Sequence, residues 1–345
     1  MDQLRIPKSS GELDVLLLTG EYQNTAGWVA LSEHNQEVFF TQVKSDPPSW
    51  LYRWFKALRA ISLTATIMPA IATVFLCLVL DAHIQWWVLV PALIAMVLLQ
   101  ISVNLLNDVE DYLKLIDLPD TLGGSGVIQS AWLTTKQIRN AGWGCFVLAG
   151  LLALPVFVVA PSIILLCALL AGIGVIGYSS KPFGFKYKAL GDVWVFLLCG
   201  PVLTAGVSLA ATGVIQPASL LLGCFFGLLA GTILNANNIN DINVDKKAGA
   251  ITIAGKLGLK NASVLQLLYY VGAFGALLMV ATLIHLSLLL PLLALPLVIK
   301  HLKVLFLAQS SEDPNLNEIR FDAAKMHLLM SVLMCIGLLL TWGWF

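Results

Sequence analysis

The sequence predicts an all-α polytopic membrane protein in which about nine transmembrane helices surround a central cavity that opens to the cytoplasmic side. The first observation is composition. Of the 345 residues, 58% are hydrophobic and 12% are charged, whereas soluble domains are roughly one-quarter charged. The second is a series of apolar runs of about 20 residues, the length that crosses the hydrocarbon core of a bilayer. The third is a net charge of zero, which indicates neither a nucleic-acid partner nor an acidic tail, and the expected surroundings of the apolar runs are membrane lipid.

Residues 1–49 differ in composition from the rest of the chain. Glu12–Thr19 and Glu37–Val43 carry apolar and β-branched residues, with Gly, Asn and Ser between them, a pattern that predicts strands. We expect a small extramembrane extension that ends near Asp46-Pro47-Pro48, and no motif in it indicates a role. A transmembrane domain then occupies residues 50–345. It opens with aromatic and basic residues typical of a membrane interface: Trp50, Tyr52, Arg53, Trp54, Lys56 and Arg59.

The predicted spans are 57–80, 86–107, 138–158, 162–180, 189–211, 217–240, 263–284, 286–306 and 325–345. The basic residues orient them. All 20 Lys and Arg lie in the N-terminal region or in the junctions 108–139, 181–188, 241–260 and 300–325. Because basic residues concentrate in cytoplasmic loops, we expect these junctions and the N-terminus to be cytoplasmic and the C-terminus to be outside. The expected location is a bacterial inner membrane.

Two stretches place acidic and amide residues where apolar runs end. In each, an Asn and two Asp recur three or four residues apart and so share one helix face: Asn104, Asp108 and Asp111 in one, and Asn237, Asp241 and Asp245 in the other. We call Asn104–Asp117 the first acidic motif and Asn237–Asp245 the second. By the charge distribution, both motifs lie on the cytoplasmic side.

The chemistry of these residues indicates a metal-assisted site. Carboxylates near a bilayer core are costly and usually mark an ion or substrate site. Mg²⁺ is commonly bound by one or two carboxylates together with phosphate oxygens and water. The two motifs therefore predict a membrane enzyme that holds a diphosphate through Mg²⁺. Nearby Lys residues would bind phosphate oxygens, and the apolar helices would surround a hydrocarbon tail.

Other interpretations remain open at this point. A single Asp at the end of a transmembrane helix is often only an interfacial residue. An ion- or proton-coupled transporter also uses intramembrane acids, but it predicts carboxylates deeper in the spans, and the segments 145–178 and 199–234 contain almost no ionisable residue. A lipid-diphosphate transferase with a non-aromatic acceptor is a further alternative.

The spacing of the two motifs resembles that of a known family. Asn107-Asp108-x-x-Asp111 followed by Asp117, together with Asp241-x-x-x-Asp245, is similar to the two aspartate-rich motifs of the UbiA superfamily of membrane aromatic prenyltransferases. The position of Asp117 is most like that in the 1,4-dihydroxy-2-naphthoate prenyltransferases of menaquinone synthesis. Further similar segments are Gly123–Gln129, Leu133–Gln137, Tyr178–Pro182, Leu190–Phe196 and Gly249–Gly258. The resemblance covers about residues 50–345.

This resemblance implies an activity and a set of site residues. The activity is transfer of an isoprenyl chain from a polyprenyl diphosphate to an aromatic acid acceptor, with no obligate protein partner. The implied Mg²⁺ ligands and catalytic residues are Asp108, Asp111, Asp241 and Asp245. The implied substrate-binding residues are Asn104, Asn107, Asn237 and Asn238, with Asp117 supporting the first motif, Lys181 and Lys246 at the diphosphate, and Tyr178 near the acceptor.

The chain departs from the naphthoate branch at several positions near the expected diphosphate. Gly126 and Ala250 stand where that branch usually has Arg and Lys, Asn240 stands for a frequent Arg, and Asn243 stands for a frequent Asp. If the activity is the usual one, other basic residues must compensate: Lys181, Lys186, Lys188, Lys246 and Lys256. Otherwise the donor or the acceptor differs.

Overall fold

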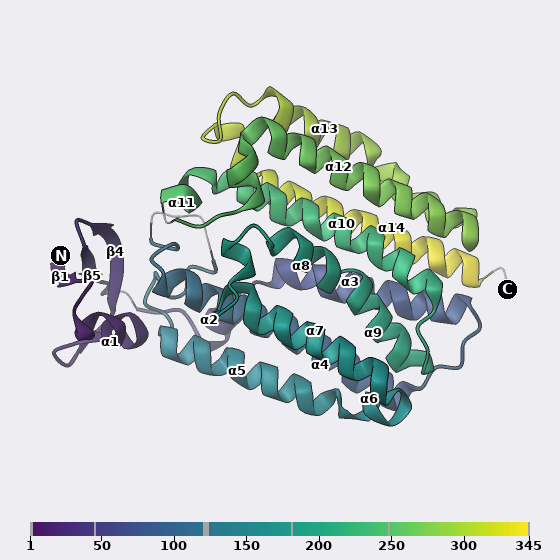
Figure 1. Ribbon diagram of the computed structural model, residues 1–345, viewed down its shortest axis with the longest axis horizontal. Coiled ribbons are helices and arrows are strands. Elements are labelled where there is room, and N and C mark those ends of the chain that lie inside the picture. Colours follow the sequence, from purple (N-terminus) through teal and green to yellow (C-terminus); the bar gives the residue numbers. More distant parts are fainter. Residues whose placement is uncertain (1–2, 45, 120–123, 181, 248, 344–345) are drawn as a thin grey trace.

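The computed structural model describes residues 3–44, 46–119, 124–180, 182–247 and 249–343. The helices lie side by side in an elongated bundle, and a small unit that contains strands lies at one end of it (Figure 1). Helix α14 ends at the opposite end of the bundle from this unit (Figure 1).

The N-terminal unit, residues 3–42, combines strands with one short helix. Its elements are β1 (Gln3–Pro7), α1 (Gly11–Thr19), β2 (Glu21–Tyr22), β3 (Thr25–Ala26), β4 (Trp28–His34) and β5 (Glu37–Gln42). β1, β5 and β4 form an antiparallel sheet in that order, so β4 is an edge strand, while β2 and β3 pair separately. The strand predicted at Glu37–Val43 is confirmed by β5. The boundary of the extension at residue 49 stays a prediction.

The strand predicted at Glu12–Thr19 is wrong, because this segment forms α1. Ser10 accepts a hydrogen bond from the Glu12 N–H and so caps the start of the helix, and Gly20 ends it in the left-handed conformation. The buried residues Leu13, Leu16 and Leu17 recur at helical spacing. These capping residues and this spacing outweigh the apolar composition on which the strand prediction depended.

The rest of the described chain is helical. The first helices are α2 (Trp50–Ala57), α3 (Ala60–Val79), α4 (Trp86–Leu113), α5 (Thr135–Leu152), α6 (Leu154–Val159) and α7 (Pro161–Ser179), followed by the 3₁₀ helix η1 (Phe185–Tyr187). The next are α8 (Gly191–Leu198), α9 (Pro201–Thr212), α10 (Pro217–Asn240), α11 (Ile242–Lys247) and α12 (Ile253–Leu283). The last are the 3₁₀ helix η2 (Leu286–Ala294), α13 (Leu295–Leu307), the 3₁₀ helix η3 (Pro314–Leu316) and α14 (Ile319–Trp342).

Within the described ranges, eight helical segments are long and apolar enough to cross a membrane. They are Ala60–Val79, Trp86–Leu113, Thr135–Val159, Gly191–Thr212, Pro217–Asn240, Ile253–Leu283, Leu286–Leu307 and Pro314–Trp342. Each coincides with one predicted span. The remaining predicted span, 162–180, coincides with the shorter apolar segment Ile163–Ser179 of α7. The polytopic all-α architecture is therefore confirmed, and the count of nine spans stays a prediction.

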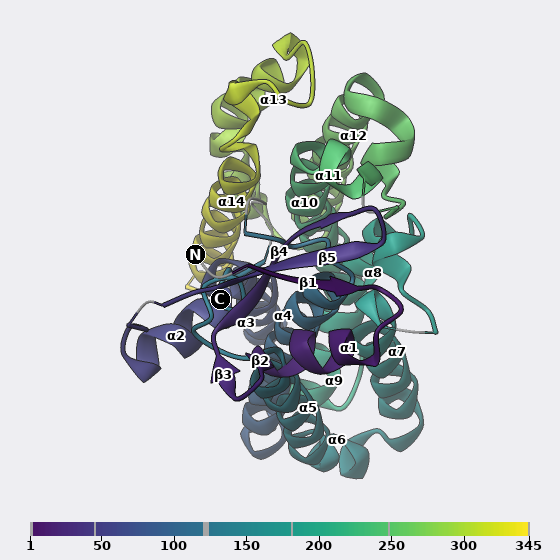
Figure 2. The same cartoon turned by 90° about the vertical axis from the view of Figure 1, so that its left-hand side faces the viewer.

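Two helices in the middle of the bundle carry the acidic motifs. α4 packs against α3, α5, α7 and α9, and α10 packs against α8, α9, α12 and α14. Both helices finish at the end of the bundle where the N-terminal unit lies (Figure 1). We call this end the acidic end. Figure 2 views the molecule from that side, with the strands in front of the bundle.

Small residues allow α10 to approach the start of α9 closely. A Cβ added at Gly227 would collide with the carbonyl oxygen of Phe196 and lie 3.2 Å from the Cα of Gly200. Backbone-to-backbone packing of this kind is typical of membrane helices, where close van der Waals contact drives association. The second acidic motif is therefore carried by α10, whose middle packs closely against Phe196 and Gly200.

We predict that Gly227→Ala lowers the thermal unfolding midpoint of the detergent-solubilised protein by several degrees, because the added methyl group overpacks this contact. Gly275→Ala in α12 is the matched control, since nothing lies within 4 Å of the added Cβ. The midpoint of this control should stay the same or rise slightly. Equal midpoints for the two variants would contradict the assignment of a tight contact at Gly227.

Candidate functional site

The last turns of α4 present two neighbouring faces with different surroundings. Asp108 and Asp111 are buried on one face, and their side chains are 4% and 2% exposed. Val109 and Tyr112, one residue further along, are buried beneath the N-terminal unit. The packing of this second face stabilises the last turns of α4, which continues to Leu113. Asp108 and Asp111 therefore belong to an ordered helix.

Asp108 is held by a cation and by a loop. Arg59 Nη1 lies 3.0 Å from Asp108 Oδ1, and the backbone N–H of Ser125 donates to Asp108 Oδ2 at 2.9 Å. Gly124 has a φ of 61°, and a Cβ there would lie 2.7 Å from Asp117 Oδ2 and 3.3 Å from Asp108 Oδ1. Only glycine fits this position, because both the conformation and the lack of space exclude a side chain.

Asn104 fixes the turn that carries Arg59. Its Nδ2 donates to the Leu58 carbonyl at 3.0 Å and to Ser62 Oγ at 2.8 Å, and its Oδ1 accepts from Gln100. Arg59 itself lies in the left-handed region, with φ 54° and ψ 59°, which is strained for a residue with a side chain. Because its amide is already engaged, Asn104 positions Arg59 in this structure, and its role as a direct oxygen donor stays a prediction.

Asp111 is the most heavily bonded acid of the site. Lys186 Nζ lies 2.6 Å from Asp111 Oδ2, and the Tyr187 hydroxyl donates to Asp111 Oδ1 at 2.6 Å. Asn107 Nδ2 also donates to Asp111 Oδ2, at 2.8 Å. Both cationic and hydroxyl partners come from the segment around η1, so this loop closes on the first acidic motif.

The second motif is arranged in a similar way. Asn237 Nδ2 donates to Asp241 Oδ2 at 2.9 Å, and Asn237 Oδ1 accepts from Arg320 Nη1 at 3.3 Å. Asn238 and Asp245 are buried beside it. Arg320 belongs to the first turn of α14, so the last membrane helix contributes to this motif.

The two motifs meet around one cavity at the acidic end. Its lining contains two cations, three amides and four acids, together with small and apolar residues: Arg59, Asn107, Asp111, Ile116, Asp117, Gly124, Lys186, Asn237, Asn238, Asp241, Val244 and Asp245. Within the described part of the chain, no three acidic, His or Cys side chains are close enough together to hold a metal ion by themselves. Two buried oxygens in this region, Asn107 Oδ1 and Asp117 Oδ2, have no hydrogen-bond partner among the described residues.

Burial and charge perturb the groups outside the membrane spans. Burial, assisted by the charge of Asp111, raises the pKa of Asp117 to about 7. Burial raises the pKa of Asp245 to about 7 against the opposing effect of Lys186, and it also raises the pKa of Asp241. For Lys186, burial alone would lower the pKa, but the nearby Asp111 outweighs it and the pKa is raised. A positive charge bound in the cavity would therefore stabilise the ionised forms of these acids.

The structure brings most of the predicted residues together, but not all of them. Tyr178 lies close enough to Lys186 for the two to interact electrostatically. Lys246 is exposed and does not line the cavity. Lys181 lies outside the described residues. Gly126 has a φ of 75°, and a Cβ there would point to within 3.9 Å of Lys56 Nζ.

Sequence reasoning missed three contributors to the site. Arg59 was interpreted only as part of the membrane-interface collar, although its side chain reaches Asp108. Tyr187 and Arg320 were not considered, since neither belongs to an acidic motif. Arg59 immediately precedes α3 and Arg320 lies in the first turn of α14, so a basic residue at the start of a membrane helix is the one signal that would have indicated them.

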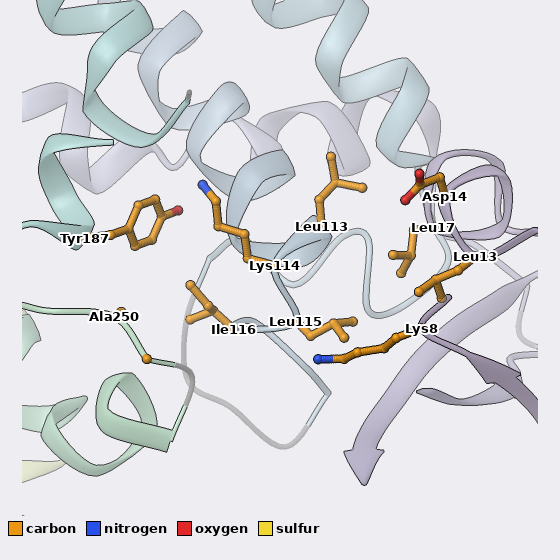
Figure 3. Close-up of a pocket in the computed structure, with 11 residues that line it drawn as sticks. Lys8, Leu13, Asp14, Leu17, Leu113, Lys114, Leu115, Ile116, Tyr187 and Ala250 are labelled. Carbon is orange, nitrogen blue, oxygen red and sulfur yellow. The ribbon is translucent and has the colours of Figure 1, made fainter. Parts of the chain in front are cut away.

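A second, more open cavity lies beside the first (Figure 3). It is formed between the N-terminal unit and the bundle, and Lys8, Leu13 and Leu17 line it on one side. Ile116 lines both cavities, and Tyr187 joins this cavity to Asp111 through its hydroxyl group. The N-terminal unit thus reaches the immediate neighbourhood of the acidic site.

Comparison with known proteins identifies the class to which this fold and site belong. The model of the UbiA prenyltransferase family matches residues 66–330. The chain therefore belongs to the UbiA prenyltransferase family, and it is a membrane prenyltransferase.

The chain is similar to several named relatives. It is 32% identical to the 1,4-dihydroxy-2-naphthoate octaprenyltransferase of Haemophilus influenzae, over 73% of this chain and 84% of that protein. It is 30% identical to the protein of that name from Mycobacterium tuberculosis, over 67% of this chain and 79% of that protein. The resemblance to the naphthoate branch is thereby confirmed.

Solved structures share the fold. A UbiA homologue from Aeropyrum pernix superposes with a TM-score of 0.58 at 15% identity, over 80% of this chain and 97% of that one. A UbiA homologue from Archaeoglobus fulgidus, solved with DMAPP and Mg²⁺ bound, superposes with a TM-score of 0.55 at 14% identity, over 84% of this chain and 99% of that one.

We predict that, without divalent cations, the contribution of Asp245 to the free energy of unfolding falls as the pH rises from about 4 to 7 and then levels off. Asp245 has a raised pKa only in the folded state, so between its ordinary pKa of 3.8 and about 7 the folded state binds more protons than the unfolded state. Stability therefore decreases with pH in this window. Asp245→Asn should flatten the slope and raise the unfolding midpoint at pH 8 by a few degrees.

Thermal unfolding in detergent with EDTA, measured across this pH range, tests the prediction. Asp322→Asn is the control, because the side chain of Asp322 is 52% exposed and lies away from the cavity. An unchanged slope in Asp245→Asn would show that this acid is not desolvated in the folded protein.

Proposed function

We propose that this protein transfers an isoprenyl chain from a polyprenyl diphosphate to 1,4-dihydroxy-2-naphthoate, the prenylation step of menaquinone biosynthesis. The observation that carries this is the meeting of two acidic helix ends around one cavity that also contains Arg59 and Lys186. Similarity to naphthoate octaprenyltransferases over most of the chain supports the choice of acceptor.

The residues of the cavity fit a bound Mg²⁺. Carboxylate and amide oxygens are suitable ligands for this hard cation, and Asn107 Oδ1 and Asp117 Oδ2 are buried oxygens without a partner in the part of the chain that the structure describes. In our proposal Asp108, Asp111, Asp241 and Asp245 hold the ion on the diphosphate. Because no three acids converge within the described ranges of the chain, phosphate oxygens and water would complete the coordination. When bound, Mg²⁺ supplies positive charge that stabilises the departing diphosphate.

Two cations of the chain have a defined part in this proposal. Arg59 and Lys186 are paired with Asp108 and Asp111 in the absence of substrate. The binding of a diphosphate offers both cations new oxygen partners and frees both carboxylates. In the absence of substrate, these two ion pairs therefore leave neither the cations nor the carboxylates buried without a partner.

The reaction exchanges one bond for another. The bond between the first carbon of the prenyl chain and the diphosphate oxygen breaks, and diphosphate leaves with the electron pair. The ring carbon that bears the acceptor carboxylate forms the new carbon–carbon bond, and the carboxylate leaves as carbon dioxide. In our proposal Tyr178 lies near the acceptor and the apolar helices enclose the tail.

The proposed location is a bacterial inner membrane with the acidic end in the cytoplasm. The N-terminus would then be cytoplasmic and the C-terminus outside. The concentration of Lys and Arg in the N-terminal region and in the junctions 108–139, 181–188, 241–260 and 300–325 supports this orientation.

We predict that Lys186→Gln raises the KM for prenyl diphosphate about tenfold or more, because a charged donor at a buried site is lost. Lys246→Gln is the matched control. Since Lys246 is exposed and outside the cavity lining, its KM should change by less than about twofold. Steady-state kinetics at saturating acceptor measure both values. An equal rise of the KM for prenyl diphosphate in both variants would instead indicate that Lys246 also binds the diphosphate.

Prenyl transfer by the purified protein tests the function itself. The assay offers labelled long-chain prenyl diphosphate with either 1,4-dihydroxy-2-naphthoate or 4-hydroxybenzoate, in Mg²⁺ or in EDTA. We expect Mg²⁺-dependent product with the naphthoate alone, and we expect Asp108→Asn and Asp241→Asn to lose it. Product with the other acceptor would leave the site intact and refute the naphthoate assignment. Full activity of both variants would refute the assignment of the site.

A further inference from the structure

The N-terminal unit packs directly against the first acidic motif. Leu105, Val109 and Tyr112 recur four and three residues apart on α4, and all three are buried in one hydrophobic cluster with residues of the unit. Their face borders the face of Asp108 and Asp111, each position being shifted by one residue. Any displacement of the unit therefore acts on the same helical turns that carry the acids.

The same cluster also anchors the loop that closes over Asp108. Val127, Ile128 and Leu133 are buried in it together with Leu16 of α1 and Phe40 of β5. The Ser125 N–H that donates to Asp108 lies two residues before Val127. This donor therefore lies next to loop residues that share a buried cluster with the N-terminal unit.

One hydrogen bond joins the unit to the motif. The backbone N–H of Ala30 donates to the Tyr112 hydroxyl at 2.9 Å, in a buried position. Ala30 belongs to the edge strand β4, next to an irregularity in its pairing with β5 between Ala30 and Ser32. The Tyr112 hydroxyl therefore accepts a hydrogen bond from the Ala30 N–H of an edge strand, where the backbone is not fully paired within the sheet. Tyr112 directly follows Asp111 in the sequence.

We propose that the N-terminal unit is an intramolecular brace for the diphosphate site, and that Tyr112 is a positioning residue through which it acts. The brace holds the last turn of α4 and the loop 124–133 so that Asp108, Asp111 and the Ser125 N–H face the cavity together. This role rests on the proposed function of the two acids. It gives residues 3–42, which lie outside the matched family region 66–330, a part in substrate binding.

The second acidic motif has a brace of a different origin. Arg320 donates to Asn237, Asn240 donates to the Asn317 carbonyl, and Asn243 contacts Glu312. Glu312 and Asn317 lie between α13 and α14, and Arg320 lies in the first turn of α14. The two motifs are thus supported separately, and loss of one brace should affect one motif.

Full-length protein with Tyr112→Phe, which removes only the hydroxyl group, tests the brace. We expect the KM for prenyl diphosphate to rise about three- to tenfold, the effect of losing one hydrogen bond, while the KM for the acceptor stays within about twofold. Leu16→Ala, which opens a cavity on the opposite side of the contact, should act in the same direction. Tyr270→Phe is the matched control, because its buried hydroxyl contacts Met326 in the other half of the bundle.

Amide hydrogen exchange on the same proteins provides a second measurement. Exchange in residues 124–133 should accelerate in Tyr112→Phe and Leu16→Ala, and exchange in residues 314–324 should not. An unchanged KM for prenyl diphosphate in both variants, even with a lower apparent kcat as expected from a loss of folded protein, would overturn the brace, and so would an equal rise of both KM values. Asp108→Asn is assayed alongside, since full activity of that variant would instead refute the proposed function.

Discussion

Carboxylates buried at the ends of apolar helices need charged or hydrogen-bonding partners, and this requirement organises one end of the molecule. Asp108 and Asp111 are almost completely buried, and each is paired with a cation from another segment of the chain. Without Arg59 and Lys186, the desolvation of these acids would be compensated only by the neutral donors Ser125, Tyr187 and Asn107. The strained backbone at Arg59 and the glycine at position 124 both follow from bringing partners so close.

This requirement explains why the site is assembled from segments that are distant in the sequence. Arg59 precedes the third helix, Lys186 belongs to a loop between α7 and α8, and Arg320 opens the last helix. Each connection brings a donor to the acidic end, and the tight contact at Gly227 holds α10 in register with α9. The membrane helices thus carry the acids of the cavity, and the loops and helix starts provide the cations that contact the two motifs.

The sequence predicts those features that depend on local patterns. Apolar length located the spans, and the spacing of Asn and Asp located the two motifs that meet around the cavity. What it did not predict depends on tertiary contact. The role of Asn104 in fixing the turn at Arg59, the approach of Tyr187 to Asp111 and the exposure of Lys246 all depend on how helices pack. The helix at Glu12–Thr19 was missed although its capping residues, Ser10 and Gly20, are visible in the sequence.

The contact between the N-terminal unit and the bundle has a consequence for biogenesis. The unit is synthesised before the bundle, but its apolar face is covered by residues of α4, by the loop 127–133 and by the beginning of α5. Until these segments have left the ribosome, that face and the edge strand β4 remain open to other proteins. Two membrane helices must therefore be inserted before the N-terminal unit can dock, so the order of translation delays completion of the acidic end.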